Sequence, residues 1–153
     1  MEVREYKQVV NELLVDIFNS ILKVEHKSIE SFAGRSLTMS EMHIIEAVGK
    51  SKDQQMSDIA KKLHITLPTL TVSVQRLNEK GYITRRRFGI DRRKVAVELT
   101  EKGKLAFDKH EEFHANMVDS LFEGLNIDKM PVLMDSITML TDFFKKQAEA
   151  LES

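Results

Sequence analysis

The chain has 153 residues, of which 31% are charged and 42% hydrophobic, the balance of a globular protein that can bury a sizeable core. It contains no Cys, which excludes disulfides and thiolate metal sites. No apolar run approaches the roughly 18 residues of a membrane span and no secretory signal is visible, so a cytoplasmic protein without membrane association is expected.

The net charge of −1 hides an asymmetry along the chain. Residues 61–104 hold 12 Lys and Arg against four Asp and Glu, a net charge of +8. The rest of the chain holds 11 basic and 20 acidic residues, a net charge of −9. A basic segment between acidic flanks is typical of proteins that bind nucleic acid, although a solvated surface can have the same composition.

The N-terminal part of the chain predicts two helices. Apolar residues recur at helical spacing over residues 6–32, a stretch with neither Pro nor Gly, which indicates one long amphipathic helix. Residues 34–36 interrupt this pattern. Ser40 is the expected N-cap of a second helix over residues 41–48, and Gly49 is its expected end.

Two short helices are predicted next, over residues 58–63 and 67–80. Ser57 and Thr66 are their expected N-caps. Gly81 supplies the left-handed residue that ends the second helix. Two short helices joined by a tight connection are typical of a helix-turn-helix.

The second short helix has two different faces. Leu70, Val74 and Leu77 are spaced by four and three residues and form an apolar stripe. The opposite face carries mostly short side chains, which would let the helix backbone lie deep in a major groove. Its longer side chains, Gln75 and Arg76, are suited to hydrogen bonds with base edges.

A period of two then indicates a β-hairpin, with strands over residues 82–87 and 94–99. Its tip, residues 88–93, is flanked by Arg and Lys on both arms, a repulsion that DNA phosphates would relieve. Asp91 precedes Arg93 by two residues and can orient its guanidinium group. A solvated charged hairpin is the alternative.

The candidate DNA-binding residues therefore lie on the second short helix and on the hairpin. They are Thr66, Pro68, Thr69, Thr71, Val72, Ser73, Gln75, Arg76, Arg85, Arg87, Asp91, Arg92, Arg93 and Lys94.

The helical period returns after the hairpin. Thr100 is the expected N-cap of a helix that ends near residue 122, before Gly124, and Asn126 or Asp128 begins a last helix. The terminal helices carry apolar faces that a small winged module cannot cover, so a homodimer is expected. Pairing would set two recognition helices about one DNA turn apart, ~34 Å.

The predicted fold is therefore mainly α, a winged helix-turn-helix with a two-stranded β-hairpin wing and long N- and C-terminal dimerisation helices. The expected regions are 1–35 for the N-terminal dimerisation helix, 36–100 for the DNA-binding region and 101–153 for the C-terminal dimerisation helices. The chain has no nucleotide-binding Gly pattern, no G-x-S-x-G and no Cys nucleophile, so neither an enzyme nor a cofactor is expected.

Histidine spacing raises the possibility of a metal site. His110 and His114 are four residues apart on one predicted helix and can bind one metal ion, with Glu25 and His43 as further ligands if they fold against them. The alternative is that no metal binds, with His114 a buried hydrogen-bonding residue and His110 at the surface.

Frequent methionines suggest either an adaptable apolar ligand pocket or ordinary core filling. The candidate pocket residues are Phe32, Met39, Met42, His43, Phe113, His114 and Met117.

Two motifs resemble a known family. Asp91-Arg92-Arg93 followed by Leu99-Thr100-Glu101-Lys102-Gly103 resembles the D-x-R and L-T-x-x-G wing signature of MarR-family regulators, and residues 77–83 resemble the end of their recognition helix. Within this family, residues 40–45 and the Phe113-His114-x-x-Met117-Val118 segment are similar to the FabT-type repressors of fatty-acid synthesis.

The resemblance implies a homodimeric repressor on a palindromic operator in double-stranded DNA. It also implies a long-chain acyl group on acyl carrier protein as corepressor. In the family pattern, Arg93 enters the minor groove and Asp91 steadies it. A response to zinc or to a small aromatic ligand stays open as an alternative.

Overall fold

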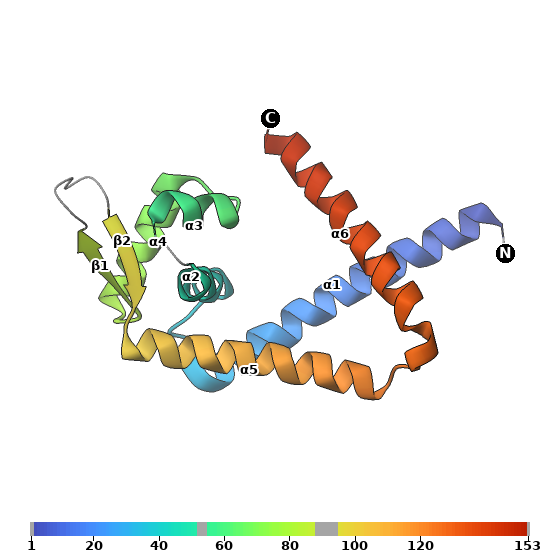
Figure 1. Cartoon of the computed structure of the whole chain (residues 1–153), viewed down its shortest axis with the longest axis horizontal. Coiled ribbons are helices and arrows are strands. Elements are labelled where there is room, and N and C mark those ends of the chain that lie inside the picture. Colours follow the sequence, from blue (N-terminus) through green and yellow to red (C-terminus); the bar gives the residue numbers. More distant parts are fainter. Residues whose placement is uncertain (1, 52–54, 88–94, 153) are drawn as a thin grey trace. The chain divides into compact units, whose positions relative to one another are not determined.

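The computed structural model describes residues 2–51, 55–87 and 95–152 and contains two compact units, Met1–His114 and Ala115–Ser153. Helices α1 (Val3–Ala33), α2 (Met39–Lys50), α3 (Met56–Lys62) and α4 (Leu67–Glu79) precede the antiparallel strands β1 (Ile83–Arg87) and β2 (Val95–Leu99). Helix α5 (Glu101–Glu123), the 3-10 turn η1 (Ile127–Lys129) and α6 (Met130–Glu152) complete the described chain (Figure 1). The predicted winged helix-turn-helix is confirmed.

The core of the first unit lies between α2, α3, α4 and the hairpin. Leu70, Val74 and Leu77 of α4 have no exposed surface, so the predicted apolar stripe is confirmed. Ile59 of α3 and Val97 of β2 are buried in the same cluster. Burial of such aliphatic side chains stabilises the fold by about 1.5–3 kcal/mol each and fixes which face of α4 is left to solvent.

Three predicted helix boundaries in the first unit are wrong. Helix α2 is capped by Thr38, not Ser40: the Thr38 hydroxyl accepts a hydrogen bond from the Glu41 amide, and the Glu41 carboxylate accepts one from the Thr38 amide. This reciprocal capping box satisfies two amides at once, which a cap at Ser40 would not. Helix α3 likewise begins two residues early, with Gln55 as its N-cap position in place of Ser57.

Gly49 lies inside α2, although the sequence predicted it to end the helix. A Cβ at this position would overlap the ring of Phe107 on α5. The missing side chain therefore allows α2 and α5 to approach closely, and the tertiary contact explains a glycine that local sequence assigned to a helix end.

Strand β2 is covered on both faces, in contrast to the predicted alternation. Val97 is buried as expected, but Ala96 of the opposite face is only 3% exposed. Ala96 forms an isolated antiparallel bridge with Gln55, just before α3. The segment leading into α3 therefore pairs with β2 beside Ala96, one residue from the end of this strand that leads to the hairpin tip.

The L-T-x-x-G motif joins the hairpin to α5. Thr100 caps α5 as predicted, because its hydroxyl accepts a 3.0 Å hydrogen bond from the Gly103 amide. The Thr100 amide in turn donates to the Tyr82 carbonyl at 3.1 Å. A Cβ on Gly103 would overlap that same carbonyl oxygen. The motif thus allows the first turn of α5 to pack against the start of the hairpin.

The second unit, residues 115–153, differs from the first in how far its residues are buried. Asn126 caps the 3-10 turn η1 by accepting a hydrogen bond from the Asp128 amide, but the last helix, α6, begins at Met130 and not at the predicted Asn126 or Asp128. Among its described residues none is buried. No helix in the described part of the chain is long and apolar enough to cross a membrane.

Replacing Gly103 with Ala should lower the free energy of unfolding by about 1–3 kcal/mol, because the new methyl group must displace the Tyr82 carbonyl or the first turn of α5. Urea unfolding measures this change. Gly124→Ala is the matched control, since its Cβ would meet only the Leu121 carbonyl at an ordinary 3.7 Å. Equal stability of the two variants would contradict the packing argument.

Candidate nucleic-acid interface

The turn between α3 and α4 is held by local hydrogen bonds. His64 adopts a left-handed conformation with φ of 53°. The Ile65 amide donates to the Ala60 carbonyl at 3.1 Å. Thr66 then caps α4 as predicted, its hydroxyl accepting a hydrogen bond from the Thr69 amide at 3.3 Å. These contacts give α4 a defined starting residue, with Pro68 in its first turn.

The outer face of α4 exposes nearly all of the predicted DNA-binding side chains of this helix. Thr69, Thr71, Gln75 and Arg76 are exposed and Ser73 is half-buried. Val72 is 52% exposed. Such short polar and small apolar groups allow close approach of the helix backbone to base edges.

Leu67 is also 47% exposed, in the first turn of α4, and sequence reasoning missed it. An apolar residue directly after an N-cap and outside the Leu70, Val74 and Leu77 stripe was the available signal. With Val72 it gives the outer face two apolar groups suited to contact with thymine methyls.

The wing arginines described by the structure are partly engaged within the fold. The Arg85 guanidinium donates to the Thr71 carbonyl of α4 at 3.1 Å, so this side chain ties the wing to the second helix. Arg86 pairs with Glu98 on the neighbouring strand at 3.1 Å. The backbone of Arg87 ends β1. The predicted residues Asp91, Arg92, Arg93 and Lys94 lie outside the described residues.

The end of α4 is fixed to α2 by an ion pair. Nζ of Lys80 is 2.8 Å from both carboxylate oxygens of Glu41, which is only 7% exposed. Burial would raise the pKa of Glu41, but hydrogen bonds from Lys80 and Thr38 outweigh it and hold that pKa below its ordinary value of 4.5. The carboxylate therefore stays charged and keeps the C-terminal end of α4 against the start of α2.

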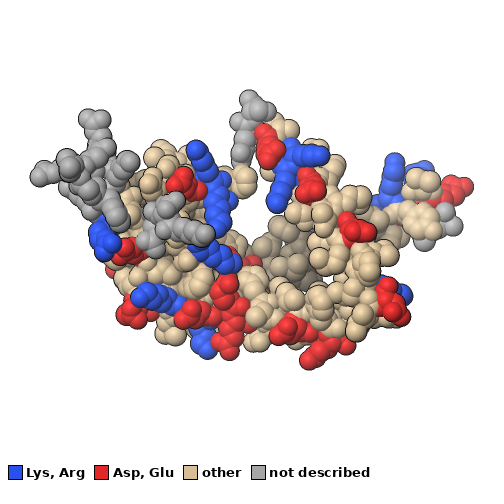
Figure 2. All heavy atoms as spheres, in the orientation of Figure 1, with Lys and Arg blue, Asp and Glu red and all other residues tan. Residues whose placement is uncertain are grey.

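Acidic side chains predominate along α5, at the lower edge of Figure 2. Glu101, Asp108, Glu111 and Glu112 belong to this part of the first unit. Helix α4 has no acidic residue in its first turn.

The four predicted metal-ligating residues come together from α1, α2 and α5. Nε2 of His43 is 2.7 Å from Oε1 of Glu25, and Nε2 of His110 and of His114 lie 3.5 Å and 3.9 Å from the same oxygen. The nitrogens Nε2 of His110 and His114 are 3.1 Å apart. One ligand atom each of Glu25, His43 and His110 lie within 4.8 Å of one another, a grouping that could hold a metal ion.

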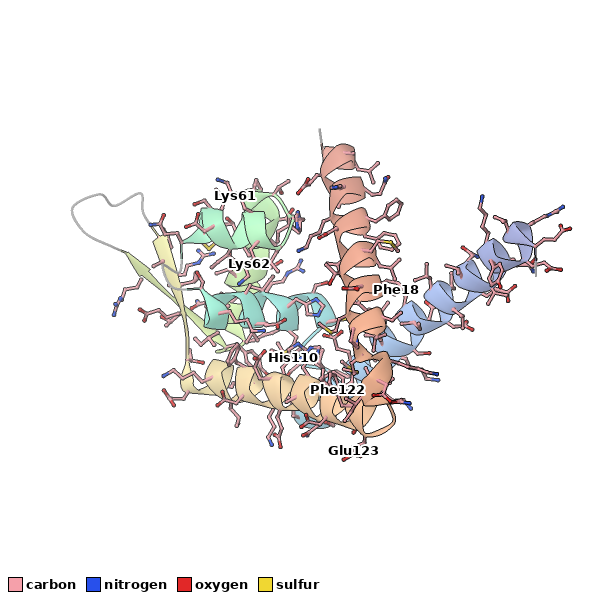
Figure 3. The ribbon with its side chains drawn as sticks, turned by 45° about the vertical axis from the view of Figure 1, so that its right-hand side comes forward. Phe18, Lys61, Lys62, His110, Phe122 and Glu123 are labelled. Atoms are coloured by element: carbon pink, nitrogen blue, oxygen red, sulfur yellow. The ribbon has the colours of Figure 1, made fainter. Side chains whose placement is uncertain are left out.

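His110 is the buried histidine, so the alternative in which His114 is buried and His110 lies at the surface is wrong. His110 has no exposed surface, whereas His114 is half-buried. Burial lowers the pKa of His110, and the neighbouring His114 lowers it further. Its Nδ1 is buried without a hydrogen-bond partner among the described residues. Figure 3 shows His110 on α5, facing α2.

The predicted ligand-pocket residues lie on α1, α2 and α5. Met42 has no exposed surface and belongs to the core, with Phe32 and Met39 packed beside it. Phe113 contacts the His114 ring edge to face, with centroids 5.1 Å apart. Met117 belongs to the second unit.

Comparison with known proteins decides the family. A family model described as "Transcriptional regulator SarA/Rot" matches residues 28–110. The chain belongs to this family of transcriptional regulators. The matched residues include α2, α3, α4, the hairpin segment and the first part of α5, as far as His110.

Solved structures agree with this family. FabT of Streptococcus pneumoniae, solved in complex with DNA, is 35% identical, with a TM-score of 0.87 over 92% of this chain and 99% of that one. A MarR regulator from Methanosarcina mazei has the same fold at 19% identity, with a TM-score of 0.69 over 91% of this chain and 98% of that one. The predicted MarR-type, FabT-like winged helix is thereby confirmed.

Curated relatives also include the HTH-type transcriptional repressor YetL of Bacillus subtilis, which is 27% identical over 88% of this chain and 80% of its own length. YetL is thus a transcriptional repressor with a helix-turn-helix. This SarA/Rot-family chain is therefore a transcriptional regulator with a helix-turn-helix.

Glu41→Gln should lower the free energy of unfolding by about 1–2 kcal/mol at pH 7, because the buried hydrogen bonds to Lys80 lose their charge. The folded pKa of Glu41 is lowered, so its contribution is present above about pH 4.5 and is lost as the pH falls through the lowered pKa. Urea unfolding should show the two proteins converging below pH 4.5. Glu101→Gln, on an exposed pair with Lys104, is the control; a constant difference at all pH values would contradict the assignment.

Proposed function

We propose that the protein is a homodimeric transcriptional repressor that inserts α4 into the major groove of a palindromic operator in double-stranded DNA. The observation that carries the proposal is the outer face of α4, which is exposed and rich in short polar groups while its inner stripe is completely buried. The likeness to a FabT structure solved with DNA supports it.

Each group on this surface then has a role suited to its chemistry. Gln75 and Arg76 bond base edges, and Val72 contacts a thymine methyl. Thr69 and Ser73 bond phosphates and set the register. In the wing, Arg93 enters the minor groove, whose negative potential attracts it, and Asp91 holds its guanidinium in place.

Arg76→Ala should weaken operator binding by about 1–3 kcal/mol and relax the preference at one base pair, because a bidentate contact to a base is lost. Fluorescence anisotropy on the operator and on single-base variants measures both effects. Lys102→Ala is the control, since this ammonium group donates to the Lys80 carbonyl within the fold. A uniform loss on all sequences would refute base reading by Arg76.

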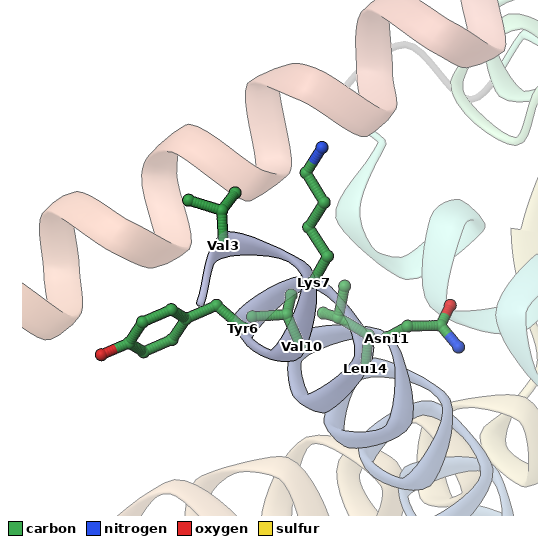
Figure 4. A pocket seen from close by; sticks show the side chains of 6 residues that line it. All are labelled: Val3, Tyr6, Lys7, Val10, Asn11 and Leu14. Atoms are coloured by element: carbon green, nitrogen blue, oxygen red, sulfur yellow. The ribbon is translucent and has the colours of Figure 1, made fainter. Parts of the chain in front are cut away.

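Exposed apolar faces on the terminal helices support the homodimer. In α1 the large apolar side chains from Val3 to Val24 are mostly exposed, with Phe18 at 63%. Val3, Tyr6, Val10 and Leu14 line a shallow pocket at the start of this helix (Figure 4). In α6, Ile137 and several other large apolar side chains are also exposed. Monomeric proteins rarely leave contiguous apolar faces of this extent open to water.

Phe18→Asp should dissociate the protein into monomers at micromolar concentration, because a carboxylate would have to be buried in an apolar interface. Sedimentation equilibrium gives the mass directly. Val72→Asp changes another exposed apolar residue, on α4, and should leave the dimer intact. A wild-type chain that sediments as a monomer would reject the dimer.

For the regulated genes, we infer repression of fatty-acid biosynthesis, with long-chain acyl-acyl carrier protein as corepressor. The support is the FabT-like motif in residues 40–45 and 113–118 together with 35% identity to FabT. Phe32 and Met39 are partly buried against the core and offer apolar groups to an acyl chain, and the Met39 side chain is adaptable.

A gel shift on the DNA upstream of the protein's own gene tests this assignment. Long-chain acyl-acyl carrier protein should tighten binding at least several-fold, and unacylated carrier protein should not. Tight binding that neither form changes would leave the repressor standing and reject this corepressor.

A second candidate is a regulator that responds to zinc, favoured by the convergence of Glu25, His43, His110 and His114. Imidazole nitrogens and one carboxylate form a donor set that zinc accepts. A bound ion would link α1, α2 and α5, the elements that carry these ligands.

His110→Ala combined with His114→Ala should abolish zinc binding, measured by competition with a chromophoric chelator, and any effect of zinc on the gel shift. His26→Ala is the control, because this exposed histidine of α1 lies outside the cluster. A wild-type protein that does not compete with the chelator for zinc would remove this candidate.

A further inference from the structure

The cations of the basic segment 61–104 fall into two groups. Most of those with described side chains are engaged within the fold. The engaged groups are Lys80 with Glu41, Lys104 with Glu101, Arg86 with Glu98, Arg85 with the Thr71 carbonyl, and Lys102 with the Lys80 carbonyl and the Tyr82 ring. A cation held in this way loses part of its interaction within the fold when it turns toward a DNA phosphate.

Lys61 and Lys62 belong to the second group. Both are exposed, and within the described residues neither ammonium group has an ion pair or hydrogen bond. They occupy the last turn of α3 (Figure 3). The acidic residue of this helix, Asp58, is in its first turn. The end of α3 therefore presents two adjacent positive charges to solvent.

The position of this lysine pair matters because α3 is the first helix of the helix-turn-helix. Only residues 63–66 separate Lys62 from the start of α4, and the hydrogen bonds around His64 and Ile65 fix that turn. In a helix-turn-helix complex the second helix enters the major groove while the first crosses the sugar-phosphate backbone. The free ammonium groups are thus carried by the helix that meets phosphates.

We infer that Lys61 and Lys62 bind backbone phosphates of the operator, so that the DNA footprint extends from α4 and the wing onto α3. The engaged lysines Lys80, Lys102 and Lys104 serve the fold and make no phosphate contact, although they belong to the same basic segment. This inference rests on the proposed DNA-binding function and specifies which charges perform it.

The test compares the salt dependence of operator affinity for wild-type protein, Lys61→Gln plus Lys62→Gln, and Lys102→Gln plus Lys104→Gln. Each phosphate contact contributes roughly one to the slope of log K against log salt. The α3 double variant should lower the slope by about two, equally on operator and on unrelated DNA. The Lys102 and Lys104 double variant should keep the wild-type slope.

Cations in the last turn of a helix also stabilise the helix through its dipole, so the unfolding of every variant is measured as well. Lys61→Arg plus Lys62→Arg keeps both charges and should keep the slope. If the α3 double variant binds with the wild-type slope, the inference is wrong and the proposed function stands. If the wild-type protein shows no salt-dependent DNA binding, both are wrong.

Discussion

Tyr82 is the junction on which the arrangement of α4, the hairpin and α5 depends. Its amide donates to the Leu77 carbonyl at the end of α4, its carbonyl accepts from the Thr100 amide, and its hydroxyl shares a hydrogen bond with Ser36. One residue thereby connects the second helix of the helix-turn-helix, the hairpin and the first turn of α5. Position 103 is occupied by Gly because this junction leaves no room for a Cβ.

Sequence alone predicted those features that local chemistry determines. The Thr66 cap, the apolar stripe of α4 and the left-handed Gly81 all follow from short-range rules, and the structure has each of them. Gly49 was misassigned because its role is set by Phe107, 58 positions further along the chain, and no local signal reports such a contact. Cap choice between Thr38 and Ser40 depended on which one could exchange hydrogen bonds with Glu41.

The sequence predicted which residues form the histidine cluster, but not which of its histidines is buried. Gly103, Ala106 and His110 are spaced by three and four residues and are all buried, so the inward stripe of α5 includes His110. That spacing was available in the sequence and would have identified the buried histidine. The sequence predicted the net charge of residues 61–104, but not which of their cations are paired within the fold. Which cations are engaged depends on partners such as Glu41 and Glu98, whose proximity only the fold creates.

The described part of the second unit has no buried residue, which affects how the protein acts at different concentrations in the cell. In the proposed homodimer, the terminal helices would gain their ordering free energy from association, so folding and assembly would become one equilibrium. Thermal stability would then rise with protein concentration. Occupancy of a two-fold symmetric DNA site would grow more steeply than linearly with the number of chains per cell, which turns a modest change in expression into a sharper change in repression.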